Sequence, residues 1–171
     1  MAEQKFNEGN ELFAQKDYQG AIEKFTEAVE LNPNYAEAYG KRGTVYIAKH
    51  EYFNALNDSN KAIELNPNLA YVYNNRGIAL LHRQEYEQAI IDFDKFLEFE
   101  PNNAEGYHNR GVSRVYLSDH KGALVDFNKA IELNPNYSSA YSWRGLCYSA
   151  CGEREKSEAD FAKAKEIGYQ D

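Results

Sequence analysis

Several kinds of segment are scarce or missing in this 171-residue chain. It has no continuous run of the roughly 20 apolar residues that a membrane-spanning helix needs. Its start, MAEQKFNEGN, lacks the apolar segment of a signal peptide. It has only two cysteines, Cys147 and Cys151, too few for a disulfide framework. We therefore expect no membrane partner and a reducing, cytoplasmic location.

Positive charge is also in short supply, with 19 Lys and Arg against 27 Asp and Glu and a net charge of −8. Nucleic-acid binding depends on clustered cations that displace counterions from phosphates, so a nucleic-acid partner is not expected. No glycine-rich phosphate loop is present, and two thiols alone make an incomplete zinc site. We predict no catalytic residues, no cofactor and no metal, and hence a protein that is not an enzyme.

Proline is rare, but its placement is regular. The four prolines lie 34 residues apart, and a fixed period of this length is typical of a repeat array. Counting back from each proline divides residues 2–171 into five repeats with no linker between them, which predicts a single domain. The prolines are Pro33, Pro67, Pro101 and Pro135, and the repeats are 2–35, 36–69, 70–103, 104–137 and 138–171.

Other columns of the repeat predict two closely packed helices in each unit. Position 8 is always Gly, positions 20 and 27 are mostly Ala, and position 24 is mostly Phe. The first helix is expected to run to about position 14. A short turn follows, in which Asp17 can cap the second helix of repeat 1. An apolar stripe then continues until Asn-Pro stops the helix. The chain is therefore predicted to be all-α.

This pattern resembles the tetratricopeptide repeat (TPR) family over essentially the whole chain. The small residues at positions 8, 20 and 27, the aromatic at 24 and the proline at 32 carry the resemblance. It implies a right-handed superhelical α-solenoid, an alpha-alpha superhelix of helix-turn-helix units whose first helices line a concave groove. The chain departs from the family at position 4, where Tyr replaces Trp or Leu, and at position 7, where Arg replaces an apolar residue.

The arginines at position 7 covary with position 23. Repeats 2 to 5 combine Arg at 7 with Asp at 23, whereas repeat 1 reverses both signs. Pairing within a repeat satisfies all five cases, so we predict an ion pair between the two helices of each repeat. The predicted pairs are Glu8–Lys24, Arg42–Asp58, Arg76–Asp92, Arg110–Asp126 and Arg144–Asp160.

Both end repeats are atypical. In repeat 5 the polar residues Arg154, Glu158 and Lys165 occupy columns that are aromatic, His or aliphatic in the internal repeats. Repeat 1 has Lys5 and Glu8 where later repeats have Tyr and Arg. Terminal repeats need a polar outer face, so we expect capped ends and a whole solenoid.

The resemblance places the peptide-binding positions on the first helices. Position 6 is Asn in three repeats, and an Asn amide both donates and accepts hydrogen bonds, so it can pair with any peptide backbone. The column is similar to the asparagine ladder of the transferase that attaches N-acetylglucosamine to Ser and Thr. Alternatively, the asparagines are solvated surface residues and Trp143 is buried at the solenoid end. The predicted binding residues are Asn10, Lys41, Tyr71, Asn74, Asn75, Ile78, His108, Asn109, Val112, Tyr116 and Trp143.

One well-known TPR ligand is not expected. The domains that capture heat-shock chaperone C-terminal tails use Lys, Asn, Asn, Lys and Arg, and here only Asn10 matches among Phe6, Asn10, Lys41, Tyr71 and Asn75. We predict an adaptor or scaffold that binds a peptide or partner segment of a protein. Two alternatives stay open: a structural solenoid that self-assembles as a homo-oligomer, and a regulatory TPR module of a larger enzyme or chaperone complex.

Overall fold

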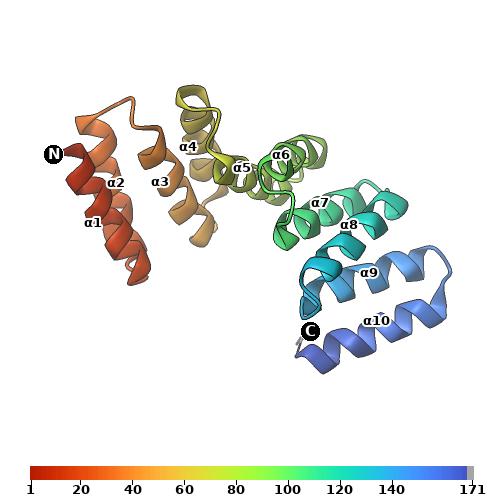
Figure 1. Ribbon diagram of the computed structural model, residues 1–171. Helices are drawn as coiled ribbons and strands as arrows, with labels where there is room; N and C mark the ends of the chain where they lie inside the picture. The colour runs from red at the N-terminus through yellow and green to blue at the C-terminus, as the bar shows by residue number, and fades with distance from the viewer. Residues whose placement is uncertain (169–171) are drawn as a thin grey trace. The chain divides into compact units, whose positions relative to one another are not determined.

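The computed structural model describes residues 1–168. These residues form ten α-helices in five consecutive helix-turn-helix pairs, with no strand in the described range (Figure 1). The predicted all-α repeat architecture is confirmed. The helices are α1 (Ala2–Ala14), α2 (Tyr18–Leu31), α3 (Ala36–Ala48), α4 (Tyr52–Leu65), α5 (Ala70–His82), α6 (Tyr86–Phe99), α7 (Ala104–Tyr116), α8 (His120–Leu133), α9 (Ser138–Ala150) and α10 (Arg154–Ile167).

Contacts group the helices into two bodies. The N-terminal body, Met1–Glu85, holds α1 to α5, and the C-terminal body, from Tyr86 onward, holds α6 to α10. The boundary lies inside the third repeat, between its two helices. The single domain over residues 2–171 stays a prediction.

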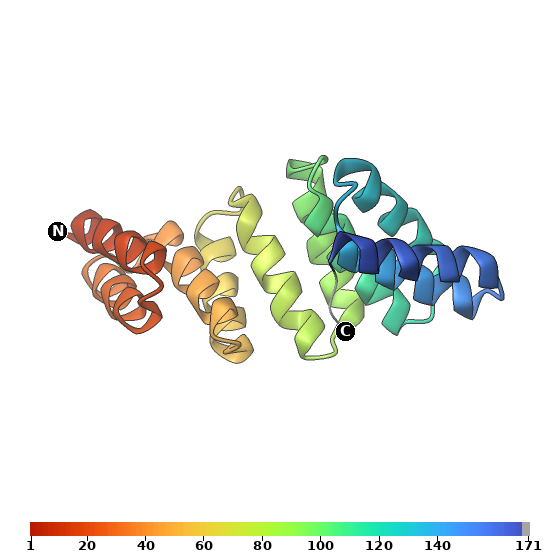
Figure 2. The ribbon, with the colours of Figure 1, turned by 90° about the horizontal axis from the view of Figure 1, so that it is seen from below.

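Each body has an inner side formed by the first helices of its repeats. In the N-terminal body α1 contacts α3 and α3 contacts α5, whereas α2 and α4 have no contact in the described residues. In the C-terminal body α7 contacts α9, whereas α8 and the described part of α10 do not touch. Figure 2 shows the helices of each body following one another in chain order. We call the side where successive first helices approach each other the inner surface of that body.

Local signals in the sequence set the ends of the second helices. The Asp17 carboxylate accepts a hydrogen bond from the Gly20 N–H at 3.0 Å, so the predicted cap is confirmed. Asp119 caps α8 in the same way through Gly122 at 2.9 Å. At the other end, α2 stops at Leu31, because Asn32 before the proline is extended at φ −140° and ψ 92°.

The glycine at position 8 is needed where a phenylalanine ring occupies position 24. A Cβ atom on Gly111 would lie 2.9 Å from the Phe127 ring, and Phe127 is fully buried. In repeat 2 the phenylalanine is replaced by Ser59, and a Cβ on Gly43 would find its nearest neighbour at 3.5 Å. The same column is therefore tightly constrained in repeat 4 and relaxed in repeat 2.

The turn between the two helices of each repeat contains one left-handed residue. In the first four repeats this residue has a side chain, and in the fifth it is Gly152, with φ +79°. Left-handed backbone crowds the Cβ atom of an L-residue, which glycine lacks. The four side-chain-bearing positions are Lys16, His50, Gln84 and Ser118, with φ between 59° and 65°.

Candidate functional site

The arginine at position 7 joins three helices. Arg42 on α3 donates from Nε and Nη2 to the two carboxylate oxygens of Asp58 on α4, at 2.7 and 2.8 Å. Its Nη1 atom donates to the Thr26 hydroxyl on α2 at 2.9 Å. One side chain thus connects the two helices of repeat 2 to the preceding repeat. We call this arrangement the arginine clasp.

The clasp recurs along the chain. Arg144 is bidentate to Asp160, at 2.8 and 2.7 Å, and also donates to Asn128 of the preceding repeat at 2.7 Å. Arg76 donates to Asn60 at 2.9 Å. Its predicted partner Asp92 lies in the other body, so that ion pair stays a prediction.

Tyrosine at position 4 belongs to the same arrangement. The Arg42 guanidinium carbon lies 5.5 Å from the Tyr39 ring centroid, a distance suited to a cation–π contact. Equivalent contacts occur in each later repeat, which gives a physical reason for Tyr where the family usually has Trp or Leu. They are Arg76 over Tyr73, Arg110 over Tyr107 and Arg144 over Tyr141.

Repeat 1 replaces the clasp with a looser charge network. The Lys24 ammonium lies 3.7 Å from Glu8 but only 2.7 Å from Glu27. Lys5 completes the network, at 3.2 Å from Glu8 and 2.9 Å from Glu27. The reversed charges do meet, but they act within a group of four rather than as an isolated pair.

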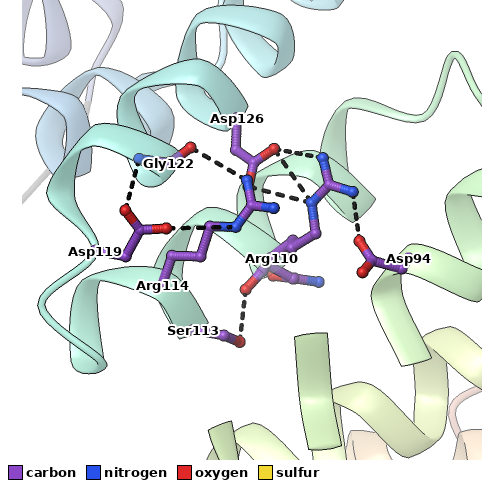
Figure 3. Close-up of polar contacts among 8 residues, drawn as sticks. Asp94, Arg110, Ser113, Arg114, Asp119, Gly122 and Asp126 are labelled. Carbon is purple, nitrogen blue, oxygen red and sulfur yellow. Dashed lines mark hydrogen bonds and ion pairs between the residues drawn. The ribbon is translucent and has the colours of Figure 1, made fainter. Parts of the chain in front are cut away.

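Repeat 4 contains the densest version of the clasp (Figure 3). Asp126 is fully buried and accepts from Arg110 at 2.6 Å and from Arg114 at 2.7 Å. Arg110 also donates to Asp94 on α6 at 2.6 Å. Burial raises the pKa of the Asp126 carboxyl, and the hydrogen bonds from Arg110 oppose that rise. The two arginines thereby fasten α7 to both α6 and α8.

On the inner surface of the N-terminal body, several predicted binding residues are already engaged. Asn75 is 7% exposed and donates from Nδ2 to the Thr44 hydroxyl at 2.9 Å. The Tyr71 hydroxyl donates to the Glu37 carbonyl at 3.4 Å, and burial raises its pKa. The Lys41 ammonium lies 5.1 Å from the Tyr71 ring centroid. These side chains link first helices to one another, a use that the sequence pattern did not reveal.

Three further predicted residues lie on the same surface. Asn10 on α1 and Ile78 on α5 are partly buried. Asn74 is also partly buried, and its Oδ1 atom is enclosed without a hydrogen-bond donor among the described residues. Their binding role stays a prediction.

His108 and Asn109 occupy the inner surface of the C-terminal body. His108 approaches the Ser139 hydroxyl through Nε2 at 3.0 Å and Asn109 Oδ1 through Nδ1 at 3.2 Å, and its ring stacks on Tyr137. Burial lowers the pKa of His108, and the contact with Asn109 opposes this shift. The imidazole thus joins α7 to α9. The Asn109 Nδ2 atom has no hydrogen-bond acceptor among the residues that the structure describes.

A row of aromatic side chains lies beside these residues. The rings of Tyr86 on α6 and Tyr116 on α7 stack in parallel, with centroids 4.8 Å apart and an interplanar angle of 4°. Trp143 on α9 meets Tyr116 edge-on at 6.0 Å and 60°. Tyr116 nevertheless remains 53% exposed, while Val112 one turn earlier is buried. Tyr116 and Trp143 belong to the predicted binding set and Tyr86 does not, and among the three rings Tyr116 is the exposed one.

Sequence reasoning missed the second acceptor of each clasp. The acceptors lie at position 25: Thr26, Asn60, Asp94 and Asn128. Repeat 5, which no described repeat follows, has Ala162 there. A comparison of position 25 with position 7 of the next repeat would have revealed this pattern.

Models of tetratricopeptide repeats match most of the chain. A model described as TPR repeat matches residues 9–49. Models described as tetratricopeptide repeat match residues 36–69, 104–137, 60–91 and 127–159. The segments 36–69 and 104–137 coincide with the helix pairs α3–α4 and α7–α8. The chain belongs to the tetratricopeptide repeat family.

Solved TPR proteins share the fold. A crystal structure of MamA has 25% sequence identity and a TM-score of 0.84, with 93% of each chain covered. MamA 41-end from Desulfovibrio magneticus RS-1 superposes with a TM-score of 0.88 at 18% identity, over 97% of this chain and 94% of the other. YrrB, described as a TPR protein with an unusual peptide-binding site, superposes with a TM-score of 0.82 at 24% identity. The match covers 96% of this chain and 84% of YrrB.

Curated relatives match over a shorter stretch. Serine/threonine-protein phosphatase 5 of Homo sapiens and of Rattus norvegicus is 41% identical over 46 residues, which is 27% of this chain. The match spans only 9% of the length of those proteins. Membership of the tetratricopeptide repeat family and the shared TPR fold support a protein-interaction module.

The structure adds one observation on membranes. None of the helices within residues 1–168 is both long and apolar enough to cross a bilayer.

Proposed function

We propose that this TPR chain is a non-catalytic adaptor that binds a peptide or an extended partner segment on the inner surface of its first helices. The exposure of Tyr116 carries the proposal. A ring that stacks on Tyr86 and touches Trp143, yet is still 53% exposed, adds little to the core for its size. Tyr and Trp are the residues that most often anchor protein interfaces.

The supports behind this surface favour a preformed site. The arginine clasps fix α7 to α6 and α8, and α9 to α8 and α10, through charged hydrogen bonds of 2.6 to 2.8 Å. A rigid surface loses little conformational entropy when a ligand binds, so more of the contact energy appears as affinity. YrrB, which shares the fold, has a peptide-binding site of its own. A cytoplasmic location remains part of the proposal.

Photo-crosslinking tests the proposal. A benzophenone amino acid is placed at Leu146, on the inner helix α9, and in a second variant at Val125, on the second helix α8. Both side chains are well exposed, at 49% and 65%, so the two probes are matched in accessibility. With peptides selected from a random 12-residue phage-displayed library, we expect covalent capture at 146 and little at 125. Capture at 125 alone, or no selectable peptide at all, would contradict the proposal.

Self-assembly is a second candidate, because apolar side chains are exposed on the second helices of the C-terminal body. Ile91 on α6 and Val125 on α8 occupy the same repeat position and are each 65% exposed. Sedimentation over a wide concentration range distinguishes the two functions. A steady monomer favours the adaptor. Growth in mass that disappears in an Ile91→Asp, Val125→Asp variant favours assembly.

A further inference from the structure

One cluster in the C-terminal body, from the first helices α7 and α9 and the second helix α6, suggests what kind of segment the adaptor selects. We call Tyr86, Tyr116, Trp143 and Leu146 the aromatic patch. Its three rings come from α6, α7 and α9, and consecutive rings are in contact at 4.8 and 6.0 Å. Leu146 lies three residues after Trp143 on α9, so the two side chains share a helix face.

Two of the four patch residues, Tyr116 and Leu146, are exposed, whereas Tyr86 and Trp143 are partly buried. Tyr116 is 53% exposed and Leu146 49%, and the neighbouring Leu117 is 37% exposed. On the same two helices, Val112 of α7 and Cys147 of α9 are buried. Contiguous exposed apolar side chains of this kind mark interaction sites more often than isolated ones do.

The first helices that carry the patch, α7 and α9, offer no free cation, whereas α6 is acidic, with Glu87, Asp92, Asp94 and Glu98 against Lys95. The charged residues of α7 and α9 are Glu105, Arg110, Arg114 and Arg144. All three arginines are bound by buried carboxylates, Arg110 and Arg114 by Asp126 and Arg144 by Asp160. The arginine charges of α7 and α9 are therefore already balanced. An acidic ligand group would lose its hydration here without gaining a free cation as partner.

We infer that the aromatic patch binds a large uncharged apolar side chain, such as Leu, Phe or Met, that anchors a peptide segment of a partner protein. This inference rests on the proposed peptide-binding function and specifies its ligand class. The chaperone-tail class of ligand, with its two carboxylates, is the opposite kind of partner.

The size of the patch favours a peptide over a second folded copy of the chain. Stable interfaces between folded proteins usually take about 20–30 residues from each side. The patch has four residues, and the adjoining inner-surface residues His108 and Ser139 are already bonded to each other. An area of this size suits one anchor side chain, with the free Nδ2 group of Asn109 available for a backbone carbonyl.

The chain contains a built-in probe of the patch, because Trp143 is its only tryptophan. Peptides are selected from a random 12-residue phage-displayed library and sequenced, and the strongest is titrated while Trp143 emission is recorded. We expect the selected peptides to share a large apolar residue and to lack charge next to it. Binding should shift Trp143 emission to shorter wavelength, because the indole loses contact with water.

Two matched variants locate the binding energy. Leu146→Lys places a charge in the patch, and Val125→Lys places the same charge at an exposed aliphatic position of the same body. Loss of an interface anchor typically weakens binding about 30-fold, so we expect this loss for Leu146→Lys and an unchanged Kd for Val125→Lys. Circular-dichroism melting curves check that both variants fold.

The contrary outcomes are distinct. Peptides that bind with charged consensus residues, leave Trp143 emission unchanged and tolerate Leu146→Lys overturn the patch inference, although peptide binding itself stands. A library that yields no binder, with no crosslink at 146, overturns both the inference and the proposed function. A Trp143 shift that appears on raising the protein concentration alone assigns the patch to a second copy and overturns the peptide as occupant.

Discussion

The guanidinium of Arg110 and the carboxylate of Asp126 meet at 2.6 Å in an environment that leaves Asp126 no exposed surface. Arg114 approaches the other carboxylate oxygen at 2.7 Å. The pair was predicted from charge covariation between repeats, but its burial and the second arginine were not. A buried ion pair contributes little net stability when intact, but breaking it leaves an uncompensated charge.

Removal of the Asp126 carboxylate should therefore be costly. We expect Asp126→Ala to lower the free energy of unfolding by about 3–5 kcal/mol, because two arginines lose their buried partner and keep only the exposed carboxylates of Asp94 and Asp119. Urea denaturation measures the change. Glu132→Ala, which breaks the exposed Lys129–Glu132 pair, is the control and should cost at most about 1 kcal/mol. Equal losses in both variants would show that the clasp is no stronger than a surface pair.

The second acceptor of the clasp has a smaller, separable effect. Asn60→Ala removes the bond from Arg76 and should cost about 1 kcal/mol. Asn57→Ala changes an exposed asparagine one turn earlier on α4, with the same gain in helix propensity. The difference between the unfolding free energies of the two variants gives the contribution of the Arg76–Asn60 hydrogen bond. No difference would mean that the bond between repeats adds nothing.

The glycine column predicts opposite effects at two equivalent positions. Gly111→Ala forces a methyl group to 2.9 Å from the buried Phe127 ring, and overpacking of this kind costs about 1–3 kcal/mol. Gly43→Ala meets its nearest atom at 3.5 Å and should stabilise by up to about 1 kcal/mol through helix propensity. Thermal melting of both variants measures the two changes in stability. Destabilisation by Gly43→Ala would show that the space beside Ser59 is smaller than the structure indicates.

The left-handed turn residues allow a further pair of substitutions with opposite expected effects on stability. Ser118→Gly should stabilise by about 1 kcal/mol, because glycine adopts φ +62° without strain, although the more flexible unfolded chain reduces this gain. Gly152→Ala should destabilise by a similar amount, since its φ is +79°. Urea midpoints of the two variants should move in opposite directions. A shift in the same direction would argue against left-handed backbone at these turns.

Stability should also fall in mildly acidic solution. Burial holds the pKa of His108 below its ordinary value of about 6.5, so below that pH the unfolded chain takes up a proton that the folded chain resists. Unfolding free energy is then retained above about pH 6.5 and lost as pH falls. His108→Gln should reduce the slope between about pH 7.5 and 5.5, and the part that remains includes the contribution of His82, whose pKa burial also lowers. An unchanged slope in His108→Gln would contradict the burial of this imidazole.

Some features of the fold and of the candidate site could be predicted from the sequence, and others could not. The helix pairs follow from proline spacing, glycine and alanine columns and Asp17, because these act locally and repeat. The ion pairs appeared because charge reverses between repeats. The hydrogen bonds from Asn75 to Thr44 and between His108 and Ser139 could not be predicted from the sequence. Each joins first helices of adjacent repeats, and polar residues of these types are equally common on solvent-exposed surfaces. Exposure of Tyr116 likewise depends on packing that no column records.

The most direct test of the central claim uses the single indole N–H of the protein. Because Trp143 is the only tryptophan, its side-chain N–H gives a single indole signal in a 1H–15N spectrum, and that signal is assigned at once. Addition of a library-selected peptide is expected to shift this signal together with the backbone amides of Tyr116 and Leu146, and to leave those of Ile91 and Val125 in place. A peptide that moves the Ile91 and Val125 amides while the indole signal stays still would contradict binding on the inner surface.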